Sequence, residues 1–377
     1  MTERRRKLRV GVIFGGRSGE HEVSLMSARS VMSAISPEHY EIVPIGITKA
    51  GAWIVGGDPM KALSSGANQA DTAPAALLAD PARQAILELS RPQGAGGESI
   101  LRSTPIDVAF PVLHGPLGED GTVQGLLELA NIPYVGAGVL ASAVAMDKAV
   151  AKDIFAARGF PIVPHVLVKR KLWEQNPAAV IADVEARIAY PCFVKPACLG
   201  SSVGISKVHQ RGELGPALDL AAQYDRKILV EKAVEPAREI EVSVLGNDEP
   251  AASVAGEIIP CREFYDYRAK YIEERSELII PAPLPPALSA QIRRIAVEAF
   301  LAIDAAGMAR VDFLLERGTD RFYLNEINTI PGFTSISMYP KLWEASGIPY
   351  SELIDRLIDL ALERHADKNR SRTSYVV

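Results

Sequence analysis

Two short segments, Arg310-Val-Asp312 and Glu326-Ile-Asn328, combine the residue types that hold a divalent metal ion beside phosphate groups. Side chains alternate along a strand, so residues at i and i+2 share one face. Both segments lie in strand-like surroundings, and the turn-forming sequence at 316–321 separates them. A single hairpin would therefore present two carboxylates and an amide together, which are ligands that suit Mg²⁺ with phosphate oxygens. The alternative is a hairpin face held only by salt bridges.

A lysine followed by a glycine-rich loop is a second candidate phosphate site. Lys195 ends an apolar run, and Leu-Gly-Ser-Ser-Val-Gly follows at 199–204. Backbone N–H groups of such a loop, with one positive charge, bind phosphates. Lys148, early in the preceding helical segment, is another candidate phosphate contact, and Glu231 and Glu239 are candidate acceptors for an amine or for ribose hydroxyls. The alternatives are a simple turn between strands and ordinary surface charges. No Walker sequence GxxxxGK[ST] occurs.

Composition limits the class of protein. The chain has 377 residues, 48% of them hydrophobic, with 41 basic and 46 acidic residues. This balance gives no electrostatic case for nucleic-acid binding. The three cysteines are sparse and lack metal-type spacing, as is typical of a reducing cytoplasm. No apolar run approaches the roughly 18 residues of a membrane span. We therefore expect a cytoplasmic protein without a membrane span, whose basic N-terminus is a solvated tail.

The N-terminal part reads as a βαβ unit. Residues 8–14 form an apolar run, residues 22–35 have a helical pattern, and residues 41–49 form a second strand-like run. The segment 66–100 is rich in Ala, Ser, Gly and Pro, and we expect a surface insertion there, with a weak helix at 81–89.

The rest of the chain divides into two further α/β regions. A helix predicted over 141–159 opens the second region. We expect domains at 1–136, 137–232 and 233–377, the last carrying the metal hairpin.

Together these motifs resemble the D-alanine–D-alanine ligases of the ATP-grasp superfamily. The resemblance follows the family's order over nearly the whole chain and rests on GGRSGEHEVS (15–24), LHGPLGEDGTVQGLLELANIPYVGAG (113–138), MDK (146–148), VKPACLGSSVGISKV (194–208), VEKAVEPAREIEVSVLG (230–246), EFYDYRAKY (263–271), ARVDFLL (309–315) and NEINTIPGFTSISMYP (325–340).

The resemblance implies a three-domain ATP-grasp fold of the α/β (α+β) class, with an N-terminal Rossmann-like βαβ domain and ATP between the other two domains. It implies ligation of two D-alanines through a D-alanyl phosphate, for bacterial peptidoglycan synthesis. It also implies a homodimer and two Mg²⁺ ions, for which Mn²⁺ substitutes. The alternative within the fold is a D-alanine–D-lactate or D-alanine–D-serine ligase.

The resemblance assigns roles residue by residue. The metal ligands would be Asp312, Glu326 and Asn328. Residues that would bind ATP are Lys148, Lys195, Ser202, Glu231, Lys232, Val234, Glu239 and Lys270. Residues that would bind the amino-acid substrates are Glu20, His114, Lys270, Ser337 and Met338. The catalytic set would be Glu20, Ser201 and Tyr271 as a hydrogen-bonded triad, with Arg310 and the Gly332 N–H as an oxyanion hole.

Two sequence features bear on substrate and reactivity. The segment 261–275, rich in Tyr and charge, is expected to be a lid, or alternatively an exposed loop. Family members that make D-alanyl-D-lactate lack the lid tyrosine, and Tyr271 is present here, which favours the dipeptide. Leu199 stands where some members have a carboxylate. Cys198 beside it suggests sensitivity to thiol reagents.

Two readings from other classes are less consistent with the residues. A dinucleotide-binding oxidoreductase is suggested by Gly-Gly-Arg-Ser-Gly-Glu at the first turn, but the spacing is not GxGxxG. A non-catalytic nucleotide-binding protein is expected to have lost charged site residues, yet the residues of the metal hairpin are all in place.

Overall fold

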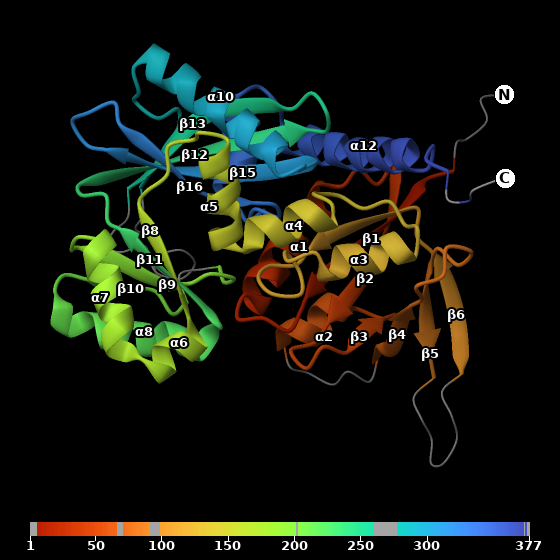
Figure 1. Cartoon of the computed structure of the whole chain (residues 1–377). Coiled ribbons are helices and arrows are strands. Elements are labelled where there is room, and N and C mark those ends of the chain that lie inside the picture. Colours follow the sequence, from red (N-terminus) through yellow and green to blue (C-terminus); the bar gives the residue numbers. More distant parts are fainter. Residues whose placement is uncertain are drawn as a thin grey trace.

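The computed structural model describes residues 6–65, 71–90, 99–200, 203–259, 277–372 and 374. These residues form three sheets with helices packed around them (Figure 1). None of the described helices has the length and apolar character needed to cross a membrane.

The N-terminal sheet has seven strands in the order β6-β5-β4-β3-β2-β1-β7. Their bounds are β1 (Leu8–Gly15), β2 (Tyr40–Ile47), β3 (Trp53–Val55), β4 (Ala73–Leu77), β5 (Ala85–Leu89), β6 (Ile100–Pro105) and β7 (Val108–Val112). The helices of this part are α1 (His21–Ala34), α2 (Pro59–Ser65) and α3 (Thr122–Leu129). Strand β1 pairs in parallel with β2 and β7, so the predicted βαβ unit is confirmed.

The helix predicted near residues 81–89 is wrong, because residues 85–89 form strand β5. This strand pairs antiparallel with β4 and β6, and Ala85, Ile86 and Leu87 are buried. A short apolar run does not distinguish strand from helix by periodicity alone, and pairing with neighbouring strands decides the outcome here. Part of the segment 66–100 therefore extends the sheet.

The central sheet is antiparallel, in the order β10-β9-β11-β8. Its strands are β8 (His165–Lys169), β9 (Cys192–Pro196), β10 (Ser206–Val208) and β11 (Lys227–Lys232). Helices α6 (Arg170–Gln175), α7 (Pro177–Arg187) and α8 (Arg211–Tyr224) accompany it. Apolar residues of α7 and α8 pack against the sheet in a core of its own. This part lies at the opposite end of the molecule from β5 and β6 (Figure 1).

The C-terminal sheet has the order β14-β13-β12-β15-β16. Its strands are β12 (Ala237–Gly246), β13 (Ala251–Ile259), β14 (Glu277–Ile279), β15 (Gly307–Glu316) and β16 (Phe322–Asn328). Helix α10 (Pro286–Ala302) lies between β14 and β15 in the chain, and α11 (Met338–Ala345) and α12 (Tyr350–Lys368) follow β16. All pairs in this sheet are antiparallel.

The single helix predicted over 141–159 is two helices, α4 (Val139–Met146) and α5 (Lys148–Ala157). They separate at Asp147, whose side chain accepts a hydrogen bond from the Val150 N–H (3.3 Å) and so caps α5. Both helices pack in one core with the C-terminal sheet and α10. Helix α5 thus begins next to the C-terminal sheet with Lys148 as its first residue.

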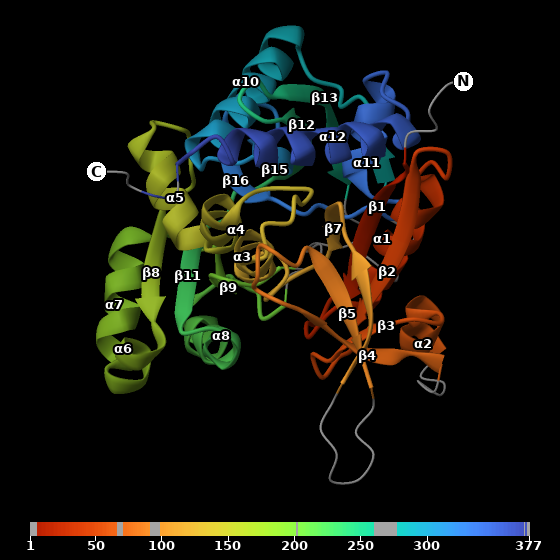
Figure 2. The same ribbon diagram turned by 90° about the vertical axis from the view of Figure 1, so that its right-hand side faces the viewer.

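The N-terminal and C-terminal parts share a second core that contains β1, β7, α1 and α12. Figure 2 shows α12 lying across the boundary between the two parts. Phe333 is fully buried at this boundary, with its ring 6.0 Å from that of Phe110 and 5.6 Å from that of Tyr339. The Phe333 N–H also donates to Ser27 Oγ (3.3 Å). These contacts fix the segment after β16 against α1.

Replacing Phe333 with alanine is therefore expected to lower the free energy of unfolding by about 3–5 kcal/mol, because a large buried ring leaves a cavity between two parts of the chain. Urea unfolding measures this loss. Leu301→Ala, at a side chain that is 46% exposed, is the control and should change little. A similar small effect for both variants would contradict this packing role.

Candidate active site

The predicted metal hairpin is present as strands β15 and β16. Asp312 lies directly opposite Glu326, and Arg310 lies opposite Asn328. Phe313 pairs with Leu324, so the residue between Leu324 and Glu326 has no partner in the ladder and forms a β-bulge. The i, i+2 spacing thus brings the four predicted residues to one place.

Arg310 is surrounded by carboxylates. Its Nε and Nη2 donate to the two oxygens of Asp312, each over 2.7 Å. Its Nε also lies 3.0 Å from Glu241 Oε2. Burial would lower the pKa of Arg310, but Asp312 and Glu241 outweigh it and raise that pKa well above its ordinary value. Arg310 is therefore a fixed positive charge.

Glu241 was not identified from the sequence. It lies on β12 opposite Asp312 and is 6% exposed. The available signal was the spacing from Glu239 in Arg-Glu-Ile-Glu-Val, because residues at i and i+2 on a strand share a face.

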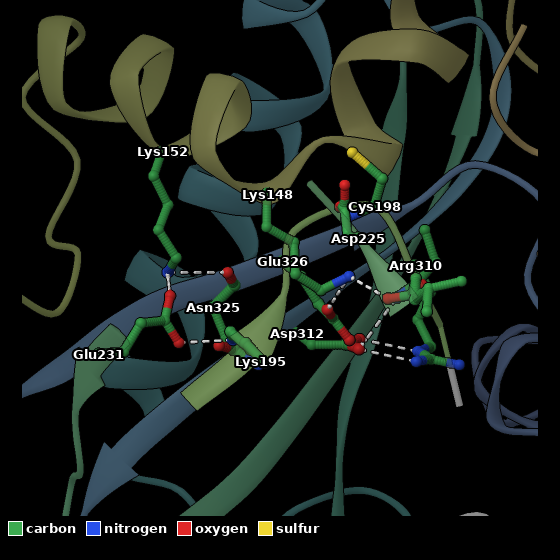
Figure 3. A network of polar contacts seen from close by, with 12 residues as sticks. Lys148, Lys152, Lys195, Cys198, Asp225, Glu231, Arg310, Asp312, Asn325 and Glu326 are labelled. Carbon is green, nitrogen blue, oxygen red and sulfur yellow. Dashed lines mark hydrogen bonds and ion pairs between the residues drawn. The ribbon is translucent and has the colours of Figure 1, made fainter. Parts of the chain in front are cut away.

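Lys148 connects the hairpin with the glycine-rich loop (Figure 3). Its Nζ lies 3.2 Å from Glu326 Oε2 and donates to the carbonyl of Leu199 (2.9 Å). Burial lowers the pKa of Lys148, yet Glu326, with smaller contributions from Glu231 and Glu119, raises it overall. The lysine is thus charged and points from the start of α5 into the site.

Glu231 is contacted by two lysines. Lys195 Nζ lies 2.5 Å from its Oε2, and Lys152 Nζ lies 2.8 Å from its Oε1. Burial would raise the pKa of Glu231, but the charges of Lys152 and Lys195 outweigh it and lower that pKa to about 2. Lys152 was also missed from the sequence. Its signal was a position one helical turn after Lys148, on the same face of α5.

A cavity of about 600 Å³ lies between the central and C-terminal sheets. It brings together most of the predicted ATP-binding and metal-binding residues that the structure describes. Its lining includes Lys148, Lys195, Glu231, Lys232, Val234, Glu239, Glu241, Arg310, Asp312 and Glu326. Its volume falls within the range of small-molecule sites, about 300–1,000 Å³.

The residues predicted to bind the first amino acid lie outside the lining of this cavity, toward the N-terminal part. Glu20, 8% exposed, directs its carboxylate between two glycines. A Cβ added to Gly115 would lie 2.8 Å from Glu20 Oε2, and one added to Gly200 would lie 3.2 Å away. Glu20 therefore lies between the loop that follows β7 and the glycine-rich loop.

His114 has a fixed orientation near Glu20. Its Nε2 lies 3.1 Å from Ser27 Oγ. Burial lowers the pKa of His114, against the opposing effects of Glu20 and of a hydrogen bond to the Ile330 backbone. The imidazole is therefore neutral at physiological pH and acts as a hydrogen-bonding group.

Gly332 and Ser337 lie close together after β16. A Cβ added to Gly332 would lie 2.7 Å from Ser337 Oγ, and that oxygen accepts a hydrogen bond from the Thr334 N–H (2.9 Å). The Met338 side chain packs instead in a small core with Ile258 and Leu342. The Met338 side chain is 4% exposed and is therefore not available to a substrate.

Several predicted residues fall outside the described part of the chain. They are Ser201, Ser202, Lys270, Tyr271 and the predicted lid at 261–275.

The donor set of the hairpin fits Mg²⁺. Asp312 and Glu326 offer carboxylate oxygens across one strand pair, and the Asn328 amide lies 3.0 Å from Asp312 Oδ2. Hard oxygen donors of this kind, with two carboxylates, match the preference of Mg²⁺. Among the described residues no group of three or more His, Cys, Asp or Glu side chains is arranged to hold a metal. Mg²⁺ usually completes such a site with water and substrate phosphate oxygens.

The surroundings of Cys198 disfavour its thiolate form. Burial, together with the nearby Asp225 carboxylate, raises the pKa of Cys198 to about 12. The thiolate, which is the nucleophile, is thus scarce near neutral pH. This argues against the sensitivity to thiol reagents that the sequence suggested.

We expect iodoacetamide near neutral pH to leave Cys198 unmodified and ATP to give no protection, since there is little labelling to prevent. Mass spectrometry of the peptide containing Cys198 measures this. Rapid labelling that ATP blocks would contradict the high pKa.

The comparisons with known proteins cover both halves of the chain. Residues 9–137 match the family model described as "D-ala D-ala ligase N-terminus", and residues 154–359 match "D-ala D-ala ligase C-terminus". The chain is 53% identical over 367 residues to the D-alanine–D-alanine ligase of Heliobacterium modesticaldum, covering 97% of this chain and 98% of that protein. It is 50% identical over 370 residues to that of Natranaerobius thermophilus, covering 98% and 99%.

Solved structures of ligases are also similar to this chain. The D-alanine-D-alanine ligase from Coxiella burnetii has a TM-score of 0.80 at 36% identity, covering 97% of this chain and 96% of that one. The VanG D-Ala:D-Ser ligase from Enterococcus faecalis has a TM-score of 0.81 at 36% identity, covering 94% and 100%. With both domain models matched and half of all residues shared over nearly its full length, the chain belongs to the D-alanine–D-alanine ligase family.

Proposed function

We propose that this protein joins two D-alanines into D-alanyl-D-alanine at the expense of ATP, with ADP and phosphate as the other products. The observation that carries this proposal is the cavity between the central and C-terminal sheets. It combines buried lysines with a carboxylate hairpin, which is the charge arrangement that phosphoryl transfer requires.

In the first step, an oxygen of the first D-alanine carboxylate bonds to the γ-phosphorus as the bond between phosphorus and the β–γ bridging oxygen breaks. The products are ADP and D-alanyl phosphate. Lys148 and Lys195 offset the negative charge of the phosphates. Glu231 and backbone groups of Lys232 and Val234 bind the adenine, and Glu239 binds the ribose. Asp312, Glu326 and Asn328 would hold two Mg²⁺ ions, with Mn²⁺ as a substitute, and these supply charge neutralisation at the phosphates.

In the second step, the free amine of the second D-alanine attacks the acyl carbon, phosphate leaves, and one proton is released. The tetrahedral intermediate carries an oxyanion, for which Arg310 and the Gly332 N–H are the proposed donors. Arg310 suits this role because it is partly buried and permanently charged.

Substrate positioning is proposed for residues near the N-terminal part. Glu20 would bind the ammonium of the first D-alanine, with neutral His114 beside it. Ser201 and Tyr271 would complete the triad with Glu20. Lys270, Ser337 and the backbone of Met338 would bind carboxylate or phosphate groups at the second-substrate end.

We propose the corresponding setting as well: domains at 1–136, 137–232 and 233–377, a lid at 261–275, a homodimer, and a role in cytoplasmic peptidoglycan precursor synthesis. The alternative acceptors, D-lactate and D-serine, remain the second candidate because the VanG D-Ala:D-Ser ligase shares the fold. The higher identity to D-alanine–D-alanine ligases favours the dipeptide.

The test is ADP release by purified protein with Mg²⁺-ATP and D-alanine. L-Alanine replaces D-alanine in one further reaction, and D-lactate or D-serine is added to D-alanine in two others. The products are identified by mass. The proposal expects one D-alanyl-D-alanine for each ADP and none with L-alanine. ADP formed only when D-lactate or D-serine is present with D-alanine would identify that compound, and not a second D-alanine, as the acceptor. Absence of ADP in every mixture would overturn the proposal.

A further inference from the structure

Lys152 is a fully buried lysine at the back of the nucleotide cavity. Its side chain is 1% exposed, and it is not among the residues that line the cavity. Its Nζ lies 2.8 Å from Glu231 Oε1 and donates to the backbone carbonyl of Asn325 (3.2 Å). Figure 3 shows Lys152 and Lys195 reaching the Glu231 carboxylate. A nucleotide in the cavity would therefore meet Glu231 and Lys195, but not Lys152.

The charges of these three groups depend on one another. Glu231 is 4% exposed and Lys195 is 6% exposed. A buried carboxylate is costly unless it is paired. Lys195 alone could compensate the charge of Glu231 if it had no other partner, but the proposed function also requires Lys195 at a phosphate. If Lys195 turned to the phosphate without Lys152 present, Glu231 would be left as a buried, uncompensated charge.

Lys152 also contacts the hairpin that carries the proposed metal ligands, through the backbone carbonyl of Asn325. Asn325 is the extra residue of the β-bulge in β16, so its carbonyl lies outside the regular ladder next to Glu326. Lys152 thus contacts both Glu231 and the residue of β16 that precedes the carboxylate Glu326.

We propose that Lys152 is a positioning residue that keeps Glu231 ionised and fixed as a hydrogen-bond acceptor and frees Lys195 for the phosphates, thereby setting nucleotide affinity and the preference for ATP over GTP. The inference rests on the proposed function, in which Glu231 accepts from the adenine 6-amino group. An ionised carboxylate attracts that amino group and repels the 6-carbonyl of guanine, which is also an acceptor. A protonated Glu231 carboxyl could donate to the carbonyl and would lose this discrimination.

The test uses Lys152→Met, which removes the charge and retains most of the side-chain volume. We expect the KM for ATP to rise about 10- to 100-fold, because a buried charged group loses its partner. We expect kcat at saturating ATP to change by less than about threefold, because Lys152 touches no reacting atom. The ratio of kcat/KM for ATP to that for GTP should fall. The same shift should appear in equilibrium binding of the two nucleotides without D-alanine.

The matched background is Glu231→Gln, which removes the carboxylate that Lys152 compensates. Lys152→Met should have little further effect on nucleotide affinity there, so the two changes should be strongly non-additive. Equal losses in both backgrounds, or an unchanged ATP-to-GTP ratio in Lys152→Met, would overturn the inference and leave Lys152 a purely structural residue.

Two further comparisons distinguish the role of Lys152 from a folding defect and from a failure of the proposed function. If Lys152→Met alone fails to fold, a folded Lys152→Met/Glu231→Gln protein would support charge compensation, and failure of both would overturn it. Wild-type protein that forms no dipeptide from ATP and D-alanine contradicts the proposed function. An active wild type with an unaffected Lys152→Met variant contradicts only the role of Lys152.

Discussion

Replacing Arg310 with glutamine is expected to lower kcat by about 10²–10³-fold, the typical cost of removing one oxyanion donor. Arg310 is held by Asp312 over two 2.7 Å hydrogen bonds and by Glu241 at 3.0 Å, so its position is fixed before the substrate arrives. Glutamine keeps a donor but removes the charge. Steady-state kinetics at saturating ATP and D-alanine measures the loss, and the affinity for ATP should change far less.

Arg238→Gln is the matched control. Arg238 lies on the same sheet and donates through Nε and Nη2 to both oxygens of Glu257, over 2.8 and 2.7 Å, as Arg310 does to Asp312. It does not line the cavity. Its loss is expected to lower stability without lowering kcat. Equal decreases in kcat for the two variants would show that Arg310 acts only through the stability of the sheet.

Replacing Asp312 with asparagine is expected to lower kcat by at least about 10²-fold, because charge stabilisation at the phosphates contributes several kcal/mol. The variant also removes one of the two carboxylates that contact Arg310, while Glu241 remains. The Mg²⁺ concentration for half-maximal activity should rise, since one of the two hairpin carboxylates is lost. A Mg²⁺ titration at fixed ATP measures both effects.

Glu316→Gln provides the corresponding control at the far end of β15. Glu316 pairs with the exposed Arg321 over 2.7 Å and does not line the cavity. Its replacement should leave both kcat and the Mg²⁺ requirement unchanged. A normal Mg²⁺ requirement in Asp312→Asn would contradict the assignment of the hairpin as the metal site.

The hairpin could be predicted from the sequence because its information is local. The i, i+2 pairs at 310–312 and 326–328 needed only strand alternation and a short turn to be placed together. The opposed pair Asp312 and Glu326 confirms this geometry. The resemblance extended the prediction to the residues around the nucleotide cavity, where the structure brings Lys148, Lys195 and Glu231 together.

The unpredicted features depend on tertiary contacts. Lys152 and Glu241 look like ordinary charges on a helix and a strand until their neighbours Glu231 and Arg310 are known. Residues 85–89 have no local pattern that distinguishes a strand from a helix. They form a strand because they pair with β4 and β6, and the sequence of 85–89 itself does not encode this pairing. Docking of Phe333 against α1 joins residues about 300 positions apart, which no local pattern encodes.

The central claim is that the first D-alanine carboxylate is activated as an acyl phosphate, and oxygen transfer tests it most directly. D-Alanine labelled with ¹⁸O in its carboxylate is incubated with protein and Mg²⁺-ATP, and the inorganic phosphate is analysed by mass spectrometry. The account predicts one ¹⁸O atom in each phosphate for each dipeptide formed, because phosphate leaves with the acyl oxygen. Phosphate without ¹⁸O, alongside dipeptide and ADP, would contradict it.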